Sequence, residues 1–153
     1  AGFSIKEENI AQLHDFLDQT MATEYNNFLL NYSSEYDAEL TTSSLTLDLV
    51  HEINKLAPFG NGNYEPVVYI DDVFVINANV VGEKHISALL APSQTAYGSK
   101  AIKAIAFNST DNDLGALLIK SRSKISIIGH LQINKWNDRD NLQIIIHDVI
   151  TEG

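Results

Sequence analysis

The chain has 153 residues, of which 44% are hydrophobic and 20% are charged. These values fit one ordinary globular domain or two very small ones, and they exclude a disordered chain. The absence of cysteine excludes disulfides and thiolate chemistry, and it favours a reducing, cytoplasmic location. No apolar run approaches the length of a membrane span, so we expect no membrane partner.

The net charge of −10 argues at first against nucleic acid as a ligand, because phosphate binding needs a positive surface. The charge is uneven along the chain, however. Residues 1–60 contain two basic and ten acidic side chains, whereas residues 61–153 contain eight basic and ten acidic ones. The second part of the chain can therefore present a local basic path although the whole chain is acidic.

The first predicted element is a helix. Ser4 and Glu7 have the spacing of a capping box, which predicts a helix start. Apolar residues then recur at near-helical spacing and predict a long amphipathic helix: Ile10, Leu13, Leu17, Met21, Tyr25 and Phe28.

A short strand and a second helix are predicted next. Alternation of apolar and acidic residues over 36–40 indicates a half-exposed strand. Thr46 is suited to cap a helix that ends before Pro58, because proline disfavours helical geometry in the residue that precedes it. The apolar face of this helix comprises Leu49, Val50, Ile53 and Leu56, and we expect His51, on its polar side, to be solvated.

A proline- and glycine-rich turn follows at residues 58–63. One interpretation is a phosphate-binding loop, but the dinucleotide and P-loop fingerprints need a preceding strand and a following helix, and neither is predicted here. The favoured interpretation is a rigid joint with positive-φ positions and Phe59 as an anchor. The candidate residues of this joint are Pro58, Phe59, Gly60, Gly62 and Asn63.

The remainder of the chain is predicted to consist mostly of strands. Extended segments are expected at residues 67–81, with a break at Asp71-Asp72, and at 84–90, 101–107, 124–134 and 142–149. A short helix capped by Thr110 separates the third strand from the fourth, although Gly115 weakens it. Gly129 interrupts the alternation of its strand and predicts a bulge or a sharp bend.

From Val73 onward, the order of five strands with a helix between the third and the fourth predicts an α+β fold. We expect a five-stranded OB-fold-like barrel preceded by a mainly helical N-terminal segment. OB-folds bind ligands across strands two and three and on the loops that join strands one to two and four to five. The last of these loops is expected at residues 135–141, between the two final strands.

These groove regions combine cations with aromatic side chains, which suits single-stranded DNA because phosphates need positive charge and unstacked bases need a π-face. The groove residues are Lys84, His85, Lys103, Phe107, Lys135, Trp136 and Arg139. Strand parity stays open: Ala104 and Ala106 can be interior with Lys103 and Phe107 outward, or the reverse. We expect Phe107 to lie nearer the core than the surface. Trp136, in a polar turn, either folds back on the barrel or contacts a partner.

Several segments of the chain resemble known sequence motifs. Residues 56–67, LAPFGNGNYEPV, resemble a LAPFGxGNPEP joint, residues 82–85 resemble a GKxHL-type strand, and residues 133–145 resemble an NxWNG…LQL hairpin. Residues 1–5 resemble the end of a GGHxxAAG phosphate-binding motif. In combination, the chain resembles the C-terminal part of the RecJ family, single-stranded-DNA-specific exonucleases of the DHH phosphoesterase superfamily. It departs from the family at Tyr64, where proline is usual, and at Asp138, where glycine is usual.

The resemblance implies a parent enzyme that degrades single-stranded DNA from 5′ to 3′ in DNA repair and recombination. Its Mn2+ or Mg2+ ions would be held by Asp and His residues of an N-terminal catalytic domain. This chain begins at Ala1 and has no DHH tripeptide, so we expect a fragment without catalytic residues or metal ligands. The hairpin motif adds Gln143 to the candidate DNA-binding residues. The expected partners are single-stranded DNA, the catalytic domain and other repair proteins.

The resemblance also implies a domain division. Residues 1–35 are expected to be the remnant of an accessory phosphoesterase-type domain, and residues 36–153 to form the barrel with its preceding strand, helix and joint.

Two pairs, Asp71-Asp72 and His147-Asp148, have side chains of metal-binding type. Neighbours on a strand point to opposite faces, so we expect both pairs to be structural or solvated.

Three hypotheses for function follow. The favoured one is a non-catalytic DNA-binding portion of a RecJ-type exonuclease. The alternative is a structural or protein-docking module that braces the catalytic domain, which the acidic net charge supports. A self-contained hydrolase ranks last, because it would rest on scattered His and Asp residues alone.

Overall fold

In the computed structural model, residues 4–31, 35–93, 101–121 and 123–151 are described. The chain divides into two compact units, residues 1–34 and 35–153. The first unit contains a 3-10 turn, η1 (Glu7–Asn9), and the long helix α1 (Ile10–Asn31), which confirms the predicted helix. The predicted capping box is wrong: Lys6 precedes η1 without a side-chain cap, because Glu7 opens the 3-10 turn instead of lying three residues inside the helix.

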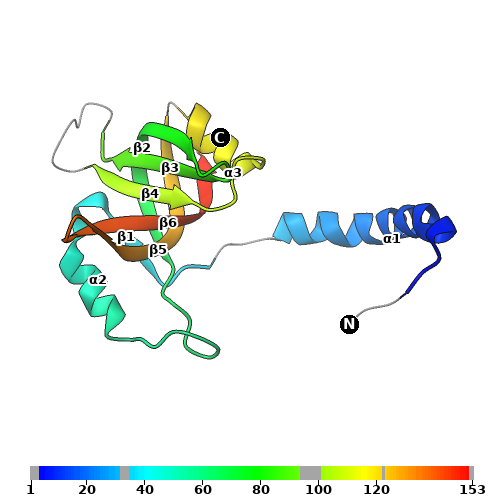
Figure 1. Cartoon of the computed structure of the whole chain (residues 1–153), viewed down its shortest axis with the longest axis horizontal. Helices are drawn as coiled ribbons and strands as arrows, with labels where there is room; N and C mark the ends of the chain where they lie inside the picture. Colours follow the sequence, from blue (N-terminus) through cyan, green and yellow to red (C-terminus); the bar gives the residue numbers. More distant parts are fainter. Residues whose placement is uncertain (1–3, 32–34, 94–100, 122, 152–153) are drawn as a thin grey trace. The chain divides into compact units, whose positions relative to one another are not determined.

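The second unit is built around a ring of strands (Figure 1). The strands are β2 (Val68–Val81), β3 (His85–Ala91), β4 (Ile102–Ala106), β5 (Lys124–Trp136) and β6 (Arg139–Thr151). Hydrogen bonding runs in the order β2-β3-β4-β6-β5 and returns from β5 to β2. All of these pairings are antiparallel except the parallel pairing of β4 with β6. The predicted α+β fold with a five-stranded OB-fold-like barrel is confirmed.

Three further elements attach to this ring. The short strand β1 (Ala38–Leu40) pairs in parallel with β2, as the alternation over residues 36–40 predicts, and η2 (Thr42–Ser44) follows it. Helix α2 (Leu47–Asn54) begins at the predicted cap, where Thr46 Oγ1 accepts a hydrogen bond from the Leu49 N–H at 3.1 Å. Helix α3 (Asp113–Lys120) lies between β4 and β5 in the chain and contacts β2, β3 and β6.

The cap of α3 differs from the prediction. Asn112, not Thr110, is the N-cap, and its Oδ1 accepts a hydrogen bond from the Gly115 N–H at 3.1 Å. Asparagine is at least as good a cap as threonine, and only position 112 directly precedes the helical turn. The sequence therefore placed the helix start two residues too early.

The core lies inside the ring. One transverse row consists of Ala88, Ala104, Ile144 and Leu131, which are successive Cα partners across β3, β4, β6 and β5, and all four side chains are buried. From outside the ring, α2 contributes Val50, which is fully buried, and α3 contributes Leu118. Burial of such aliphatic side chains is the main source of stability, at roughly 1.5–3 kcal/mol for each large one.

Three bulges interrupt the pairing of the long strands, and one of them lies between Val75 and Asn77, where β2 pairs with β3. Asp71 and Asp72 do not break the strand as predicted; both lie between Ile70 and Val73 in a continuous β2, where the pairing with β5 shifts by one residue. The third bulge lies between Ile128 and Gly129 and confirms the prediction for Gly129. A β-carbon there would lie 2.0 Å from the Ile145 carbonyl oxygen, so only glycine fits.

The joint between α2 and β2 is organised by Asn63. Its Nδ2 donates hydrogen bonds to the Leu56 and Pro58 carbonyl oxygens, both at 2.9 Å, and its backbone pairs with that of Gly60. Gly62 has a positive φ of 82° and Phe59 is half-buried. The role of these residues as a rigid joint stays a prediction.

Candidate nucleic-acid interface

The hairpin between β5 and β6 is tighter than predicted. The strands continue to Trp136 and Arg139, so only Asn137 and Asp138 form the turn. Their φ values are +50° and +57°, the left-handed geometry of a two-residue turn that matches the twist of the flanking strands. The expected connector over residues 135–141 is therefore mostly strand, in which Lys135 and Asp140 are Cα partners across the two strands.

Lys135 and Arg139 are both exposed on this hairpin. The backbone of Trp136 pairs with that of Arg139, but the Trp136 side chain lies outside the described part of the structure.

A second row of polar side chains crosses the outside of the ring. Lys103, Gln143 and Gln132 are successive Cα partners on β4, β6 and β5. Adjacent strands lie about 4.8 Å apart, so these three side chains are neighbours on one face. Lys103 and Gln132 are exposed, and Gln143 is half-buried.

Lys84 and His85 lie where β2 turns into β3. The Asn108 N–H donates a hydrogen bond to His85 Nδ1 at 3.0 Å, which fixes the imidazole. The ring of Phe107 meets that of His85 edge to face, with centroids 5.0 Å apart. Lys84 is exposed, and its carbonyl oxygen accepts a hydrogen bond from the Ser109 N–H.

The prediction that Phe107 lies near the core is wrong, because 51% of this residue is exposed. Ala104 and Ala106 are fully buried, which settles the parity of β4 with Lys103 and Phe107 outward. The strand register decides this: Ala104 faces Ala88 and Ile144 in a crowded interior row where a phenylalanine would not fit.

The candidate residues therefore form two groups. Lys103, Gln143, Lys135 and Arg139 follow β4, β6 and the β5–β6 hairpin. Lys84 and His85 lie at the opposite end of β3, since the partner of Lys103 on that strand is Leu89, four residues beyond His85. At about 3.3 Å per residue the two groups are roughly 13 Å apart along the strand.

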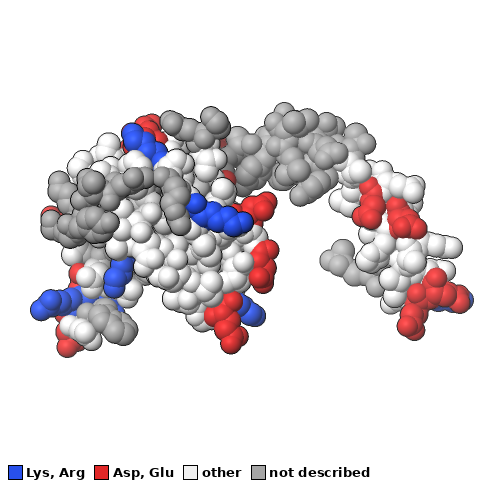
Figure 2. Space-filling view, turned by 90° about the horizontal axis from the view of Figure 1, so that it is seen from above, with Lys and Arg blue, Asp and Glu red and all other residues white. Residues whose placement is uncertain are grey.

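The cations of both groups are available to an anionic ligand. Ion pairs among the described residues involve Lys6, Lys55 and Lys124, and none involves Lys84, Lys103, Lys135 or Arg139. On the face of the molecule that Figure 2 shows, basic side chains lie singly or in small groups, some beside acidic ones, and do not merge into one broad patch. This distribution favours a few separate phosphate contacts over a broad basic surface.

A cleft that the sequence did not predict lies between α2 and the β5–β6 hairpin. Its volume is about 540 Å³, and its lining includes four side-chain amides, those of Asn54, Gln132, Asn134 and Gln143. His51 also lines it, so this solvated histidine lies beside the candidate residues. The only sequence signal was the presence of His51 and Asn54 three residues apart on the polar side of one helix.

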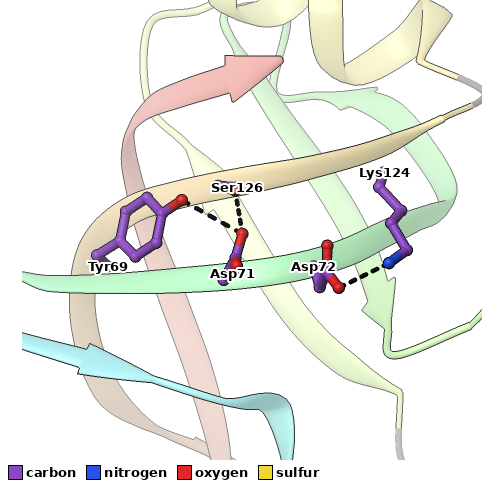
Figure 3. Close-up of polar contacts among 5 residues, drawn as sticks. All are labelled: Tyr69, Asp71, Asp72, Lys124 and Ser126. Atoms are coloured by element: carbon purple, nitrogen blue, oxygen red, sulfur yellow. Dashed lines mark hydrogen bonds and ion pairs between the residues drawn. The ribbon is translucent and has the colours of Figure 1, made fainter. Parts of the chain in front are cut away.

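The Asp71-Asp72 pair is held by β5 (Figure 3). Asp71 Oδ1 accepts hydrogen bonds from Ser126 Oγ at 2.6 Å and from the Tyr69 hydroxyl at 3.2 Å, and Asp72 Oδ2 pairs with Lys124 Nζ at 2.6 Å. The hydrogen bond from Ser126 is the main reason that the pKa of Asp71 is lowered. Because of the bulge, both carboxylates reach β5 side chains two residues apart, although strand alternation predicts opposite faces.

His147 packs against His130 instead of pairing with Asp148 at a site. The two imidazoles meet edge to face with centroids 4.3 Å apart, and His130 Nδ1 donates to the Pro66 carbonyl oxygen at 2.9 Å. Burial, and then repulsion from His130, lowers the pKa of His147, while Glu65 acts in the opposite direction. Within the described ranges, no three His, Cys, Asp or Glu side chains form a group that could hold a metal ion.

No helix in the described part of the chain has both the length and the apolar character to cross a membrane.

Comparison with known proteins finds two relatives that share one printed name. The chain is 27% identical to the single-stranded-DNA-specific exonuclease RecJ of Bacillus subtilis over 154 residues, which cover 97% of the chain and 18% of that protein. It is 27% identical to RecJ of Haemophilus influenzae over 148 residues, which cover 95% of the chain and 24% of that protein. The chain thus spans about a fifth of the length of these curated relatives.

Solved structures share the fold. A crystal structure of RecJ in complex with Mn2+ from Thermus thermophilus superposes with a TM-score of 0.54 at 16% identity, over 91% of this chain and 20% of that chain. A putative aspartyl-tRNA synthetase from Leishmania major gives a TM-score of 0.51 at 10% identity, over 86% of this chain and 26% of that chain. The family model of the RecJ OB domain matches residues 36–148. The chain therefore belongs to the RecJ OB domain family.

Proposed function

We propose that this chain is the non-catalytic, single-stranded-DNA-binding portion of a RecJ-type 5′-to-3′ exonuclease that acts in DNA repair and recombination in the cytoplasm. The observation that carries the proposal is the presence of three exposed cations, Lys103, Lys135 and Arg139, on β4 and the β5–β6 hairpin, none of them in an ion pair among the described residues. Such cations neutralise phosphates without reading sequence.

Phe107 adds a second kind of contact. Its exposed ring, held against His85, can stack on an unstacked base, and such stacking contributes about 1–3 kcal/mol per base. Lys84, adjacent to His85, would meet a neighbouring phosphate. The two groups of residues would then bind different nucleotides of one strand.

Cutting the strand is assigned to the parent enzyme. We propose that its catalytic domain holds Mn2+ or Mg2+, and that this chain presents the strand to it. The contacts proposed here need no metal ion, since they consist of cations, amides and an aromatic ring. Other repair proteins are proposed as further partners of the parent enzyme.

The direct test is titration of a fluorescent single-stranded oligonucleotide with the chain at several salt concentrations. We expect weak binding, and the logarithm of the binding constant should fall linearly with the logarithm of the salt concentration. The magnitude of this slope should decrease by about 0.7 for each phosphate contact that is removed. Lys103→Ala, Lys135→Ala and Arg139→Ala should each reduce this slope. Lys120→Ala, an exposed lysine on α3, is the matched control and should leave the slope unchanged.

Phe107→Ala should weaken binding without changing the salt slope, because stacking involves no counterion release. If the wild-type chain does not bind the oligonucleotide even at low salt, the DNA-binding proposal is wrong. That outcome would favour the alternative of a structural or docking module, to which the net charge of −10 is suited.

A further inference from the structure

The cleft between α2 and the β5–β6 hairpin has an unusual lining for a surface that binds phosphate. Its four amides are neutral, and its charged side chains include one lysine and one aspartate, Lys135 and Asp140, which are Cα partners on the hairpin. A phosphate group would gain little from such a balanced set of charges. A neutral, polar ligand with both donors and acceptors fits the lining better.

Nucleobases are ligands of this kind. Each base presents hydrogen-bond donors and acceptors along its edge, and unpaired bases are bound by contacts to those edges. An Asn or Gln side chain carries one acceptor and two donors and can present either after rotation about its last bond. Several amides around one cleft can therefore satisfy any of the four bases, while Ile133 supplies an apolar wall for a ring.

The position of the cleft matches a strand held by the neighbouring cations. Gln143, in the cleft, is the Cα partner of Lys103, and Lys135 is itself part of the lining. A phosphate at Lys103, outside the cleft, would leave the base of the same nucleotide beside the amides. The cleft volume of about 540 Å³ can accommodate a base with its sugar.

We infer that this cleft is a subsite for one unstacked nucleobase, bound through its edge by Asn54, Gln132, Asn134 and Gln143 whatever its identity. The inference rests on the proposed function and adds to it. The cations hold the backbone, and the cleft requires that a base be present. A strand with an abasic nucleotide at this subsite is therefore bound less tightly than an intact strand.

The test uses the 153-residue chain and a set of fluorescent oligonucleotides in which one abasic position is moved along the strand. For the wild-type chain, one position should weaken binding about fivefold, the effect of losing one to two net hydrogen bonds. Asn54→Ala and Gln143→Ala should weaken binding of the intact strand, and the difference between intact and abasic strands should become smaller in both. Asn54 is exposed at the end of α2, so its removal leaves the core intact.

Two controls separate the contributions. Asn79→Ala removes an exposed amide on β2, outside the cleft, and should keep the difference between intact and abasic strands. Lys103→Ala should weaken both strands equally. The inference is overturned if no abasic position matters, or if the difference keeps its wild-type size in both Asn54→Ala and Gln143→Ala. Failure of the wild-type chain to bind any oligonucleotide would instead refute the proposed function itself.

Discussion

The backbone carbonyl oxygen of Ser109 occupies the space that a β-carbon on Gly115 would need, at a distance of only 1.6 Å. Gly115 is buried in the first turn of α3, where its N–H is bonded to the cap residue Asn112. The glycine that weakens this helix by propensity is thus the residue that allows α3 to approach the end of β4.

Gly115→Ala should therefore destabilise the protein even though alanine is the better helix former by about 1 kcal/mol. Forcing a methyl group against a backbone carbonyl typically costs about 1–3 kcal/mol, which outweighs the gain in propensity. Chemical denaturation should give a lower midpoint for this variant. Ala116→Gly, in the same helix, is the control and should lose only about 1 kcal/mol. A Gly115→Ala variant more stable than the wild type would contradict the geometry.

The turn at Asn137-Asp138 makes a second prediction. Asp138 has a φ of +57°, a conformation that costs an L-residue roughly 1–2 kcal/mol and glycine almost nothing. We expect Asp138→Gly to raise the free energy of unfolding by about 1 kcal/mol, measured by urea denaturation. The same change removes a negative charge next to Arg139, so oligonucleotide binding should tighten at low salt.

Asp138→Asn separates these two effects. Asparagine removes the charge but keeps a side chain, so it should match Asp138→Gly in DNA binding and gain less stability. Equal stability of the two variants would show that the backbone conformation of residue 138 is not strained.

The lowered pKa of His147, caused first by burial and then by repulsion from His130, predicts a pH dependence of stability. The pKa of folded His147 lies below its ordinary value of 6.5, so below that pH the unfolded chain binds more protons than the folded chain. The contribution of His147 to the free energy of unfolding is therefore largest above pH 6.5 and decreases as the pH falls toward the lowered pKa. Urea denaturation across this range should show a smaller decrease for His147→Asn, and His14→Asn, on α1, serves as the control variant.

The hydrogen bond from Ser126 to Asp71 predicts a pH dependence of stability at acidic pH, this time from a carboxyl group. Because the pKa of folded Asp71 is below 3.8, the carboxylate stabilises the fold above that pH, and this contribution is lost as the pH falls through the lowered pKa. In Ser126→Ala the pKa of Asp71 should rise, as measured by NMR titration of the carboxyl carbon. Tyr69→Phe should raise it less, since that hydrogen bond is longer. An unchanged pKa in Ser126→Ala would exclude the serine as its cause.

Local signals predicted the elements well where the cause was local. Thr46 caps α2, Gly129 marks a bulge, and the order of strands and α3 predicts the barrel. Two local predictions, the capping box at Ser4 and the cap at Thr110, were nevertheless wrong. The error at Phe107 has a different origin, because distant partners decide its position. The outward position of Phe107 follows from the register of β4 against β3 and β6, which no pattern within residues 101–107 contains.

The same reason explains what the sequence missed at the candidate site. The cleft exists because α2 and the β5–β6 hairpin lie side by side, although Asn54 and Gln132 are far apart in the chain. The hairpin itself was predicted, but its polar residues suggested a long loop. A two-residue left-handed turn lets such residues remain paired, so polarity alone did not reveal where the strands end.

The place of β6 in the ring has a consequence for biosynthesis. β6 lies between β4 and β5, and it is the last of the five strands to leave the ribosome. Until it is made, the nascent chain exposes unpaired edges of both neighbouring strands, which favours association with other chains. Barrel closure therefore waits for the synthesis of β6, and premature termination before residue 139 would leave the facing edges of β4 and β5 unpaired.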